Sequence, residues 1–330
     1  MPARRSAAAA MLAVTLACAS GPSAVADEAL YKVAAGPYAV ETAAGLKLVD
    51  PSRERKIDLR VTYPKAEGKL PLIVFSHGAW GTNYNYHPLV QHWASHGYVV
   101  VQPNHLDAVA EGVRFGDQKV FSPLYSESRI ADDKYILDRA ADLGVAAIEG
   151  RIDETRIAVA GHSYGANTAM LMGGLTVFDP SGRGRRAGDP RVKAVAALSG
   201  QGRGAGLTEA SYATIGLPML VLTGSRDPGR KGEGYEWRLE PFEFAAPGDK
   251  YLLFIQNADH SFGGMTEEAP GFPKIGMRDL PKVQAHVDYV NSVTTAFFDA
   301  YLLGDGAARA YLATNAIGRL TNGAASVTAK

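Results

Sequence analysis

The sequence predicts an α/β protein built on a mostly parallel, doubly wound sheet flanked by helices. The chain has 330 residues, of which 46% are apolar and 21% are charged, a composition and length typical of one large α/β domain. From about residue 56 onward, short apolar runs alternate with stretches of helical periodicity. Most of these runs are continuous, as expected for strands that are buried on both faces. This alternation predicts a ligand site at the carboxyl ends of the strands.

The individual elements follow from the same alternation. Residues 56–63 alternate between apolar and polar side chains, which is typical of a half-exposed strand. Buried strands are predicted at residues 72–75, 98–101, 156–160, 194–198, 218–223 and 251–255. Helical periodicity predicts helices at residues 84–96, 130–148, 163–173 and 283–303.

Residues 27–330 are predicted to form a single domain. This part of the sequence contains no internal repeat and no linker that would divide it. Only about 20 residues separate the strand at 194–198 from the strand at 218–223, which is too few for a large helical cap domain over the site.

Residues 1–26 are predicted to be a signal peptide. Arg4 and Arg5 form a positive start, residues 7–17 form a short apolar run, and an A-x-A cleavage pattern follows. We therefore expect the mature chain to begin near Asp27 and to be secreted or periplasmic. The apolar run is too short to cross a bilayer, and no later stretch reaches the roughly 18 apolar residues that a membrane span needs.

The only cysteine, Cys18, lies inside this signal. The residues before it match a lipoprotein site poorly, because the leucine is displaced by one position. The mature chain is therefore expected to lack disulfides, thiol nucleophiles and thiolate metal sites. No pairing of histidines with carboxylates has metal-ligand spacing, so we expect no metal and no cofactor. The net charge is zero, which favours neither nucleic acid nor an anionic membrane as a partner, and the oligomeric state stays open.

The segment GHSYG at residues 161–165 contains the candidate nucleophile, Ser163. It follows a predicted buried strand and begins a predicted helix. A serine at such a strand-to-helix turn is held with its hydroxyl exposed, and the glycines two residues away let the strand and helix approach each other. This context predicts a nucleophile elbow.

A serine hydroxyl needs a base, and two residues that follow later strands fit the order serine, acid, histidine. Asp227 follows the strand at 218–223, and His260 follows the strand at 251–255. His260 is predicted to act as general base and acid, and Asp227 to orient its ring. Asp259 is the alternative acid, although a sequence neighbour rarely orients the same ring.

Two backbone N–H groups are predicted to bind the oxyanion. One belongs to Tyr164, directly after the nucleophile and at the start of a helix. The other comes from the Gly-rich loop SHGAWG at residues 76–81, where Ala79 is the expected donor.

Taken together, these motifs resemble those of esterases of the α/β-hydrolase superfamily. The resemblance rests on GHSYG, HGAWG, TGSRD and ADHSFGG and runs from about residue 70 to residue 303. It implies an α/β-hydrolase fold, and the nearest groups are dienelactone-hydrolase-like proteins, platelet-activating-factor acetylhydrolases and polyester hydrolases. Dienelactone hydrolases proper have a cysteine where this chain has Ser163. Polyester hydrolases usually have methionine where this chain has Tyr164, together with a C-terminal disulfide.

The predicted function is the hydrolysis of small-molecule or polymeric carboxylic esters through an acyl-enzyme. Candidate substrate contacts are the aromatic residues of the surrounding loops, Trp80, Tyr84, Trp237 and Phe262, and the loop at 105–121. An amidase or peptidase, a polyester hydrolase and a non-catalytic binding protein remain alternatives on the same fold.

Overall fold

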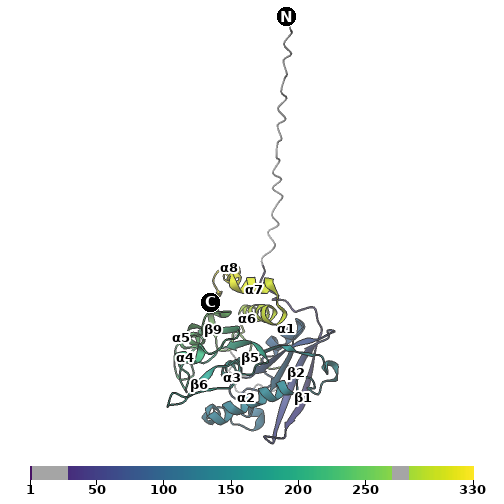
Figure 1. Ribbon diagram of the computed structural model, residues 1–330, viewed down its shortest axis with the longest axis vertical. Coiled ribbons are helices and arrows are strands. Elements are labelled where there is room, and N and C mark those ends of the chain that lie inside the picture. The colour runs from purple at the N-terminus through teal and green to yellow at the C-terminus, as the bar shows by residue number, and fades with distance from the viewer. Residues whose placement is uncertain (2–28, 270–281) are drawn as a thin grey trace.

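In this computed structural model, residue 1 and residues 29–269 and 282–330 are described. They form a nine-stranded sheet in the order β1-β2-β4-β3-β5-β8-β9-β10-β11 (Figure 1). The strands from β4 to β10 are parallel, whereas β1, β2 and β11 run antiparallel to their neighbours. The sheet strands are β1 (Val40–Asp50), β2 (Arg55–Pro64), β3 (Leu70–Ser76), β4 (Val99–Pro103), β5 (Ile152–His162), β8 (Val192–Leu198), β9 (Met219–Arg226), β10 (Lys250–Asp259) and β11 (Ala325–Ala329).

Helices cover both faces of this sheet. On one face lie α1 (His87–Ser95) and α6 (Gln284–Phe298), and on the other lie α2 (Pro123–Asp138), α3 (Tyr164–Met172) and α5 (Glu236–Glu243) (Figure 1). Between β8 and β9 the chain forms only the short helix α4 (Glu209–Tyr212). After α6, a π-helical turn (Asp299–Leu303) leads to α7 (Gly306–Ala313) and α8 (Ala316–Leu320). This is the α/β-hydrolase fold without a large cap domain, as the sequence predicts.

Alternation along the central strands divides the core between the two faces. In β3, Leu72 and Val74 belong to the cluster under α2 and α3, whereas Ile73 and Phe75 belong to the cluster under α1 and α6. All four side chains are fully buried. Burying a side chain of this size contributes about 1.5–3 kcal/mol, which explains why these strands are apolar at every position.

Helix α2 begins and ends earlier than the predicted helix at 130–148. Pro123 occupies its first turn, a favoured position because proline lacks the N–H that has no helical partner there. The helix ends at Asp138, and the chain then turns at Asp142, whose carboxylate accepts a hydrogen bond from the Gly144 N–H at 3.1 Å. Gly144 has a φ of 73°, which a helix does not allow, so the periodic stripe there is not one helix.

The sequence did not predict the two outer strands or a small hairpin. In β1 a register shift between Ala43 and Leu46 interrupts the alternation that marks a strand. The hairpin, β6 (Thr176–Phe178) and β7 (Gly184–Arg186), forms a separate two-stranded sheet.

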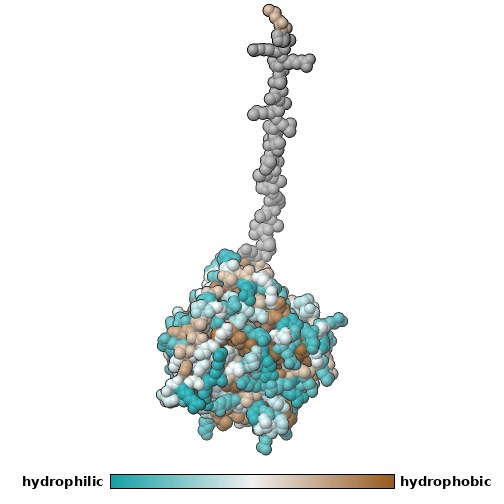
Figure 2. All heavy atoms as spheres, viewed as in Figure 1, coloured by the Kyte–Doolittle hydropathy of each residue, from teal (hydrophilic) through white to brown (hydrophobic). Residues whose placement is uncertain are grey.

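The face shown in Figure 2 is mainly hydrophilic or neutral, with hydrophobic side chains in small groups. Among the residues that the structure describes, no helix is both long and apolar enough to cross a bilayer. Residues 2–28, which hold most of the predicted signal peptide and Cys18, lie outside the described residues.

Candidate active site

Ser163 lies between β5 and α3 in a strained backbone conformation, with φ 55° and ψ −116°. Such a conformation costs about 1–3 kcal/mol and persists only where the surroundings enforce it. The flanking glycines are a steric requirement. A Cβ on Gly161 would overlap the Gly165 carbonyl, and a Cβ on Gly165 would overlap the Ser76 carbonyl. The local geometry is therefore that of the predicted nucleophile elbow.

Asp227 and His260 form a hydrogen-bonded pair at the carboxyl ends of two strands of the sheet. His260 Nδ1 lies 2.7 Å from Asp227 Oδ1. Asp227 directly follows β9, and His260 directly follows β10. The Asp227 side chain is fully buried, whereas that of His260 is 39% exposed. The pair therefore has one solvent-accessible end, the imidazole.

Asp227 has three further polar neighbours, Ser199, Thr223 and Arg238, none of which is a predicted site residue. Ser199 Oγ donates to its Oδ2 at 2.5 Å and also lies 2.8 Å from His260 Nδ1. Thr223 Oγ1 donates to the same Oδ2 at 3.1 Å, and Arg238 Nε lies 3.2 Å from Oδ1. Burial by itself raises the pKa of Asp227, but the hydrogen bond and charge of His260, the charge of Arg238 and the Ser199 hydroxyl together lower it to about 2. Asp227 is therefore ionised at neutral pH.

Asp259, the alternative acid, points elsewhere. Its Oδ1 accepts hydrogen bonds from the Ser261 N–H at 2.9 Å and from Ser261 Oγ at 2.8 Å. The carboxylate thus caps its own turn and does not contact the His260 ring.

Among the described residues, the Ser163 hydroxyl and His260 Nε2 form no hydrogen bond with each other. Contacts between a nucleophile and its base are often long before substrate binds and shorten in the complex. The elbow and the histidine loop are nevertheless connected, because the ring of His162 lies 4.5 Å from the ring of His260.

The loop that contains Ala79 lies against the elbow. A Cβ built on Gly78 would lie 3.5 Å from Ser163 Cβ, an ordinary contact distance. Within the described part of the chain, neither the Ala79 N–H nor the Tyr164 N–H donates a hydrogen bond. Within that part, both predicted oxyanion donors therefore lack a protein acceptor.

Of the predicted substrate contacts, Trp80 belongs to an aromatic cluster beside this loop. Its ring centroid is 5.2 Å from that of Phe115 and 5.5 Å from that of Phe121. Phe121 in turn lies 5.2 Å from Tyr164. Trp80 is half-buried and Phe115 is exposed, so the cluster offers apolar surface next to the elbow. The sequence places Phe115 and Phe121 in the candidate loop at 105–121 but does not single them out.

The other three predicted contacts are dispersed. Tyr84 lies beside Arg60 of β2, with the guanidinium 5.8 Å from its ring. Trp237, in α5, donates from Nε1 to the Arg203 carbonyl at 2.9 Å. Phe262 is fully buried and packs edge-on against His162, so it has no surface for a ligand in this arrangement.

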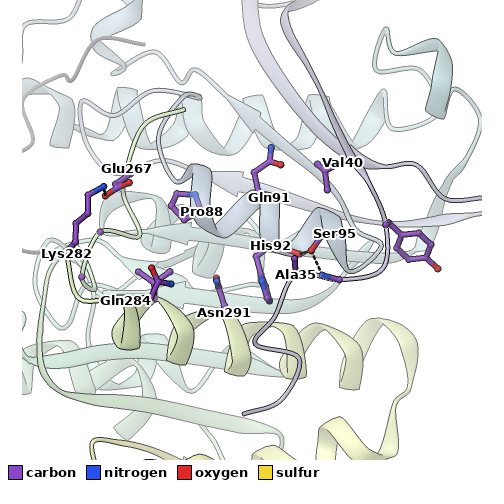
Figure 3. A pocket seen from close by; sticks show the side chains of 15 residues that line it. Ala35, Val40, Pro88, Gln91, His92, Ser95, Glu267, Lys282, Gln284 and Asn291 are labelled. Atoms are coloured by element: carbon purple, nitrogen blue, oxygen red, sulfur yellow. Dashed lines mark hydrogen bonds and ion pairs between the residues drawn. The ribbon is translucent and has the colours of Figure 1, made fainter. Parts of the chain in front are cut away.

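A cavity of about 470 Å³ lies elsewhere, between α1, α6 and the N-terminal segment (Figure 3). Pro88, Gln91 and His92 line it from α1, and Gln284 and Asn291 line it from α6. None of the residues that line it is a candidate catalytic residue. Among the described residues, no group of three or more His, Cys, Asp or Glu side chains could hold a metal ion.

Ser199 and Arg238 differ in how well a sequence could reveal them. Ser199 directly follows β8, between the strands that precede Ser163 and Asp227, so its position at a strand end is a usable signal. Arg238 lies within α5 and reaches Asp227 through the tertiary fold, and no sequence spacing indicates that contact.

Comparisons with known proteins find one family match and one curated relative. Residues 33–176 match the Chlorophyllase family. Chlorophyllase-1 of Arabidopsis thaliana is 26% identical to this chain over 127 residues, which cover 37% of this chain and 35% of that protein. The aligned part therefore spans about a third of the length of this curated relative.

The family match includes Ala79, Ser163 and Tyr164 and ends before Asp227 and His260. It therefore bears on the elbow and the oxyanion loop, and not on the acid and the base. The more specific resemblance to dienelactone-hydrolase-like proteins and platelet-activating-factor acetylhydrolases stays a prediction.

Proposed function

We propose that this protein is a serine hydrolase that cleaves carboxylic esters through an acyl-enzyme on Ser163. The observation that carries the proposal is the strained serine at the end of β5, together with the Asp227–His260 pair at the ends of β9 and β10. These strands are parallel members of one sheet, so all three side chains lie at the carboxyl ends of its strands. The match to a family of esterases over the elbow half of the chain supports the same reaction class.

In the proposed reaction, Ser163 Oγ attacks the ester carbonyl carbon while His260 Nε2 takes its proton. Asp227 accepts from Nδ1 and stabilises the imidazolium that forms. The N–H groups of Ala79 and Tyr164 bind the oxyanion, and such a donor is worth about 2.7–4 kcal/mol in the transition state. His260 then returns the proton to the leaving alkoxide. A water molecule, deprotonated by the same imidazole, cleaves the acyl-enzyme and regenerates the serine.

The proposed substrates are esters with an apolar part that packs against Trp80, Phe115 and Phe121. The short segment between β8 and β9 leaves room for large or polymeric esters. Because the matched family and the curated relative are named chlorophyllases, an ester of chlorophyll should be among the substrates tested. We also propose that the chain is exported, because its N-terminal sequence has the features of a signal peptide.

The test compares p-nitrophenyl esters of graded acyl length with matched p-nitroanilides. Turnover of the esters alone is expected, and preferential turnover of the anilides would favour an amidase or peptidase. Ser163→Ala should lower kcat by about 10⁴ to 10⁶ while the circular dichroism spectrum is unchanged. An organophosphonate should label Ser163 in the wild type, and EDTA should leave the rate unchanged. Wild-type protein that neither turns over esters nor reacts with the phosphonate would contradict the proposal.

A further inference from the structure

Arg129 of α2 is a fully buried cation behind the oxyanion loop. It forms a bidentate ion pair with Asp107, from Nε to Oδ1 at 2.8 Å and from Nη2 to Oδ2 at 2.7 Å. The remaining donors of its guanidinium reach two consecutive loop carbonyls. Nη1 donates to the His77 carbonyl at 2.8 Å, and Nη2 contacts the Gly78 carbonyl at 3.3 Å. One side chain thus connects the 105–121 loop with the oxyanion loop.

These contacts determine which way the Ala79 N–H points. The described chain contains no cis peptide bond, so the Gly78 carbonyl and the Ala79 N–H lie on opposite sides of one planar peptide group. Three donors hold the Gly78 carbonyl: Arg129, the Gly81 N–H at 3.0 Å, and His77 Nδ1 at 2.7 Å. With its carbonyl held there, the peptide must present the Ala79 N–H on the opposite side.

The same guanidinium also contacts the residue that carries the second donor. Its central carbon lies 4.6 Å from the centroid of the Tyr164 ring, within the range of a cation–π interaction. Tyr164 is the first residue of α3, and its N–H is the other oxyanion donor of the proposed function. Arg129 therefore contacts the peptide group that carries the Ala79 N–H, through the Gly78 carbonyl. It also contacts the side chain of Tyr164, whose backbone N–H is the second donor.

We propose that Arg129 is a positioning residue that fixes the distance and orientation between the two oxyanion donors, Ala79 N–H and Tyr164 N–H. It acts through the Gly78 carbonyl on one side and the Tyr164 ring on the other, and it does not touch the substrate. The inference rests on the proposed ester hydrolysis. Lysine does not replace arginine in this role, because an ammonium group lacks the planar fork that binds a carboxylate and two carbonyls together.

Two variants separate positioning from stability. Arg129→Lys keeps a positive charge beside Asp107. The double variant Arg129→Met/Asp107→Leu removes both charges. It therefore avoids leaving one charge buried without its partner, which is strongly destabilising. Arg191→Lys is the matched control, because Arg191 also pairs bidentately with an aspartate, Asp189, at 2.9 and 2.7 Å, away from the site.

The measurements are kcat and KM for a p-nitrophenyl ester and the inhibition constant of a trifluoromethyl ketone, which forms a tetrahedral adduct with a serine. Each is taken at a temperature where circular dichroism shows the variant to be folded. Both Arg129 variants should lower kcat by about 10- to 100-fold, with KM changed by less than about threefold, because the lost contacts act on the oxyanion. Affinity for the ketone should fall by a similar factor, and the control should match the wild type.

Two results would overturn the inference and leave the proposed function intact. One is an unchanged kcat in either folded Arg129 variant. The other is a loss of kcat without a loss of ketone affinity, which would show that the oxyanion donors had not moved. Wild-type protein without turnover and without phosphonate labelling would overturn the proposed function, and this inference with it.

Discussion

His162 Nε2 lies 2.8 Å from the backbone carbonyl of His260, so the residue before the elbow serine holds the loop of the candidate base. Nε2 must donate in this contact, which leaves Nδ1 as an acceptor for the Tyr86 hydroxyl at 3.0 Å. The Tyr86 oxygen in turn accepts from the Gly78 N–H at 3.0 Å. Burial lowers the pKa of His162 well below its ordinary value, so the ring stays neutral and this order of donors is maintained. A single imidazole thus connects the elbow, the histidine loop and the oxyanion loop.

Tyr86→Phe should impair both stability and catalysis. The change leaves the Gly78 N–H and His162 Nδ1 buried without partners, and each such group costs about 1–3 kcal/mol. The free energy of unfolding in urea should fall by that order, and kcat should fall because both loops are loosened. Tyr98→Phe is the control, since Tyr98 is also buried and donates to Asp299 at 2.5 Å, away from the site. It should lose stability and keep the wild-type kcat. Equal kcat in the two variants would show that the connection has no catalytic role.

Asp227→Asn should lower kcat by about 10⁴, the size of effect known for the acid of a serine triad. The amide can donate towards His260 Nδ1, which favours the tautomer with its proton on Nε2, the wrong nitrogen. Asp259→Asn should have little effect on kcat, because the Asp259 carboxylate accepts hydrogen bonds from Ser261 in its own turn and does not contact the His260 ring. Steady-state kinetics of the two variants, made side by side, check this. A greater loss in Asp259→Asn would reassign the acid.

Asp133→Asn should stabilise the protein at neutral and alkaline pH. Burial raises the pKa of Asp133 from 3.8 to about 6, and its Oδ1 has no hydrogen-bond partner among the described residues. Between about pH 4 and pH 6 the folded protein therefore holds a proton that the unfolded chain has lost, so stability falls as pH rises through this window. Above pH 6 the full cost is about 3 kcal/mol, and the variant avoids it.

Urea unfolding at pH 4 and at pH 8 measures this effect. The stability of Asp133→Asn relative to the wild type should rise by about 2–2.5 kcal/mol from the lower to the higher pH, since part of the cost is already present at pH 4. A pH-independent difference for Asp133→Asn would mean that Asp133 is already ionised at pH 4.

Export should remove the first 26 residues. Intact-mass measurement of protein recovered from the periplasm or the medium of an expressing bacterium should give a chain that begins near Asp27. That chain should contain no cysteine, because Cys18 is removed with the signal. A retained Cys18 that carries lipid would make the protein a lipoprotein.

The sequence predicts the central strands well because each one is continuously apolar and is followed by a clear turn. β3, β5, β8 and β10 include their predicted segments, and β9 begins at Met219, one residue after the start of the predicted segment at 218–223. The edge strand β1 escapes prediction because it is half-exposed and its register shifts near Ala43. The start of α2 is missed because the first turns after Pro123 are exposed or only half-buried, so no apolar periodicity marks them. Local sequence patterns thus identify strands and helices whose burial is uniform along their length. They fail for elements in which burial changes from one end to the other.

The residues of the candidate site also differ in whether the sequence predicts them. Ser163, Asp227 and His260 are visible in the sequence because each follows a strand, and strand order brings them to one edge. Arg129 and Arg238 act from within helices, and each binds an aspartate and backbone carbonyls that only the tertiary fold brings near, so neither contact leaves a mark on sequence spacing. Phe262 is recognisable as an aromatic next to the histidine, but only the fold reveals that its ring is fully buried.

The last residues of the chain cover an edge of the sheet. β11 pairs antiparallel with β10, from Tyr251 opposite Ala329 to Ile255 opposite Ala325, and the Lys330 carbonyl accepts from the Lys250 N–H at 3.1 Å. Without β11, β10 would present a row of unpaired N–H and C=O groups flanked by apolar side chains, a template for strand pairing between molecules. β11 is itself the outer strand, but it has five residues, the last two of them exposed, whereas β10 has ten. Short edge strands are poor templates for pairing, so a protein shortened by these few residues should aggregate even where its reactive groups are intact.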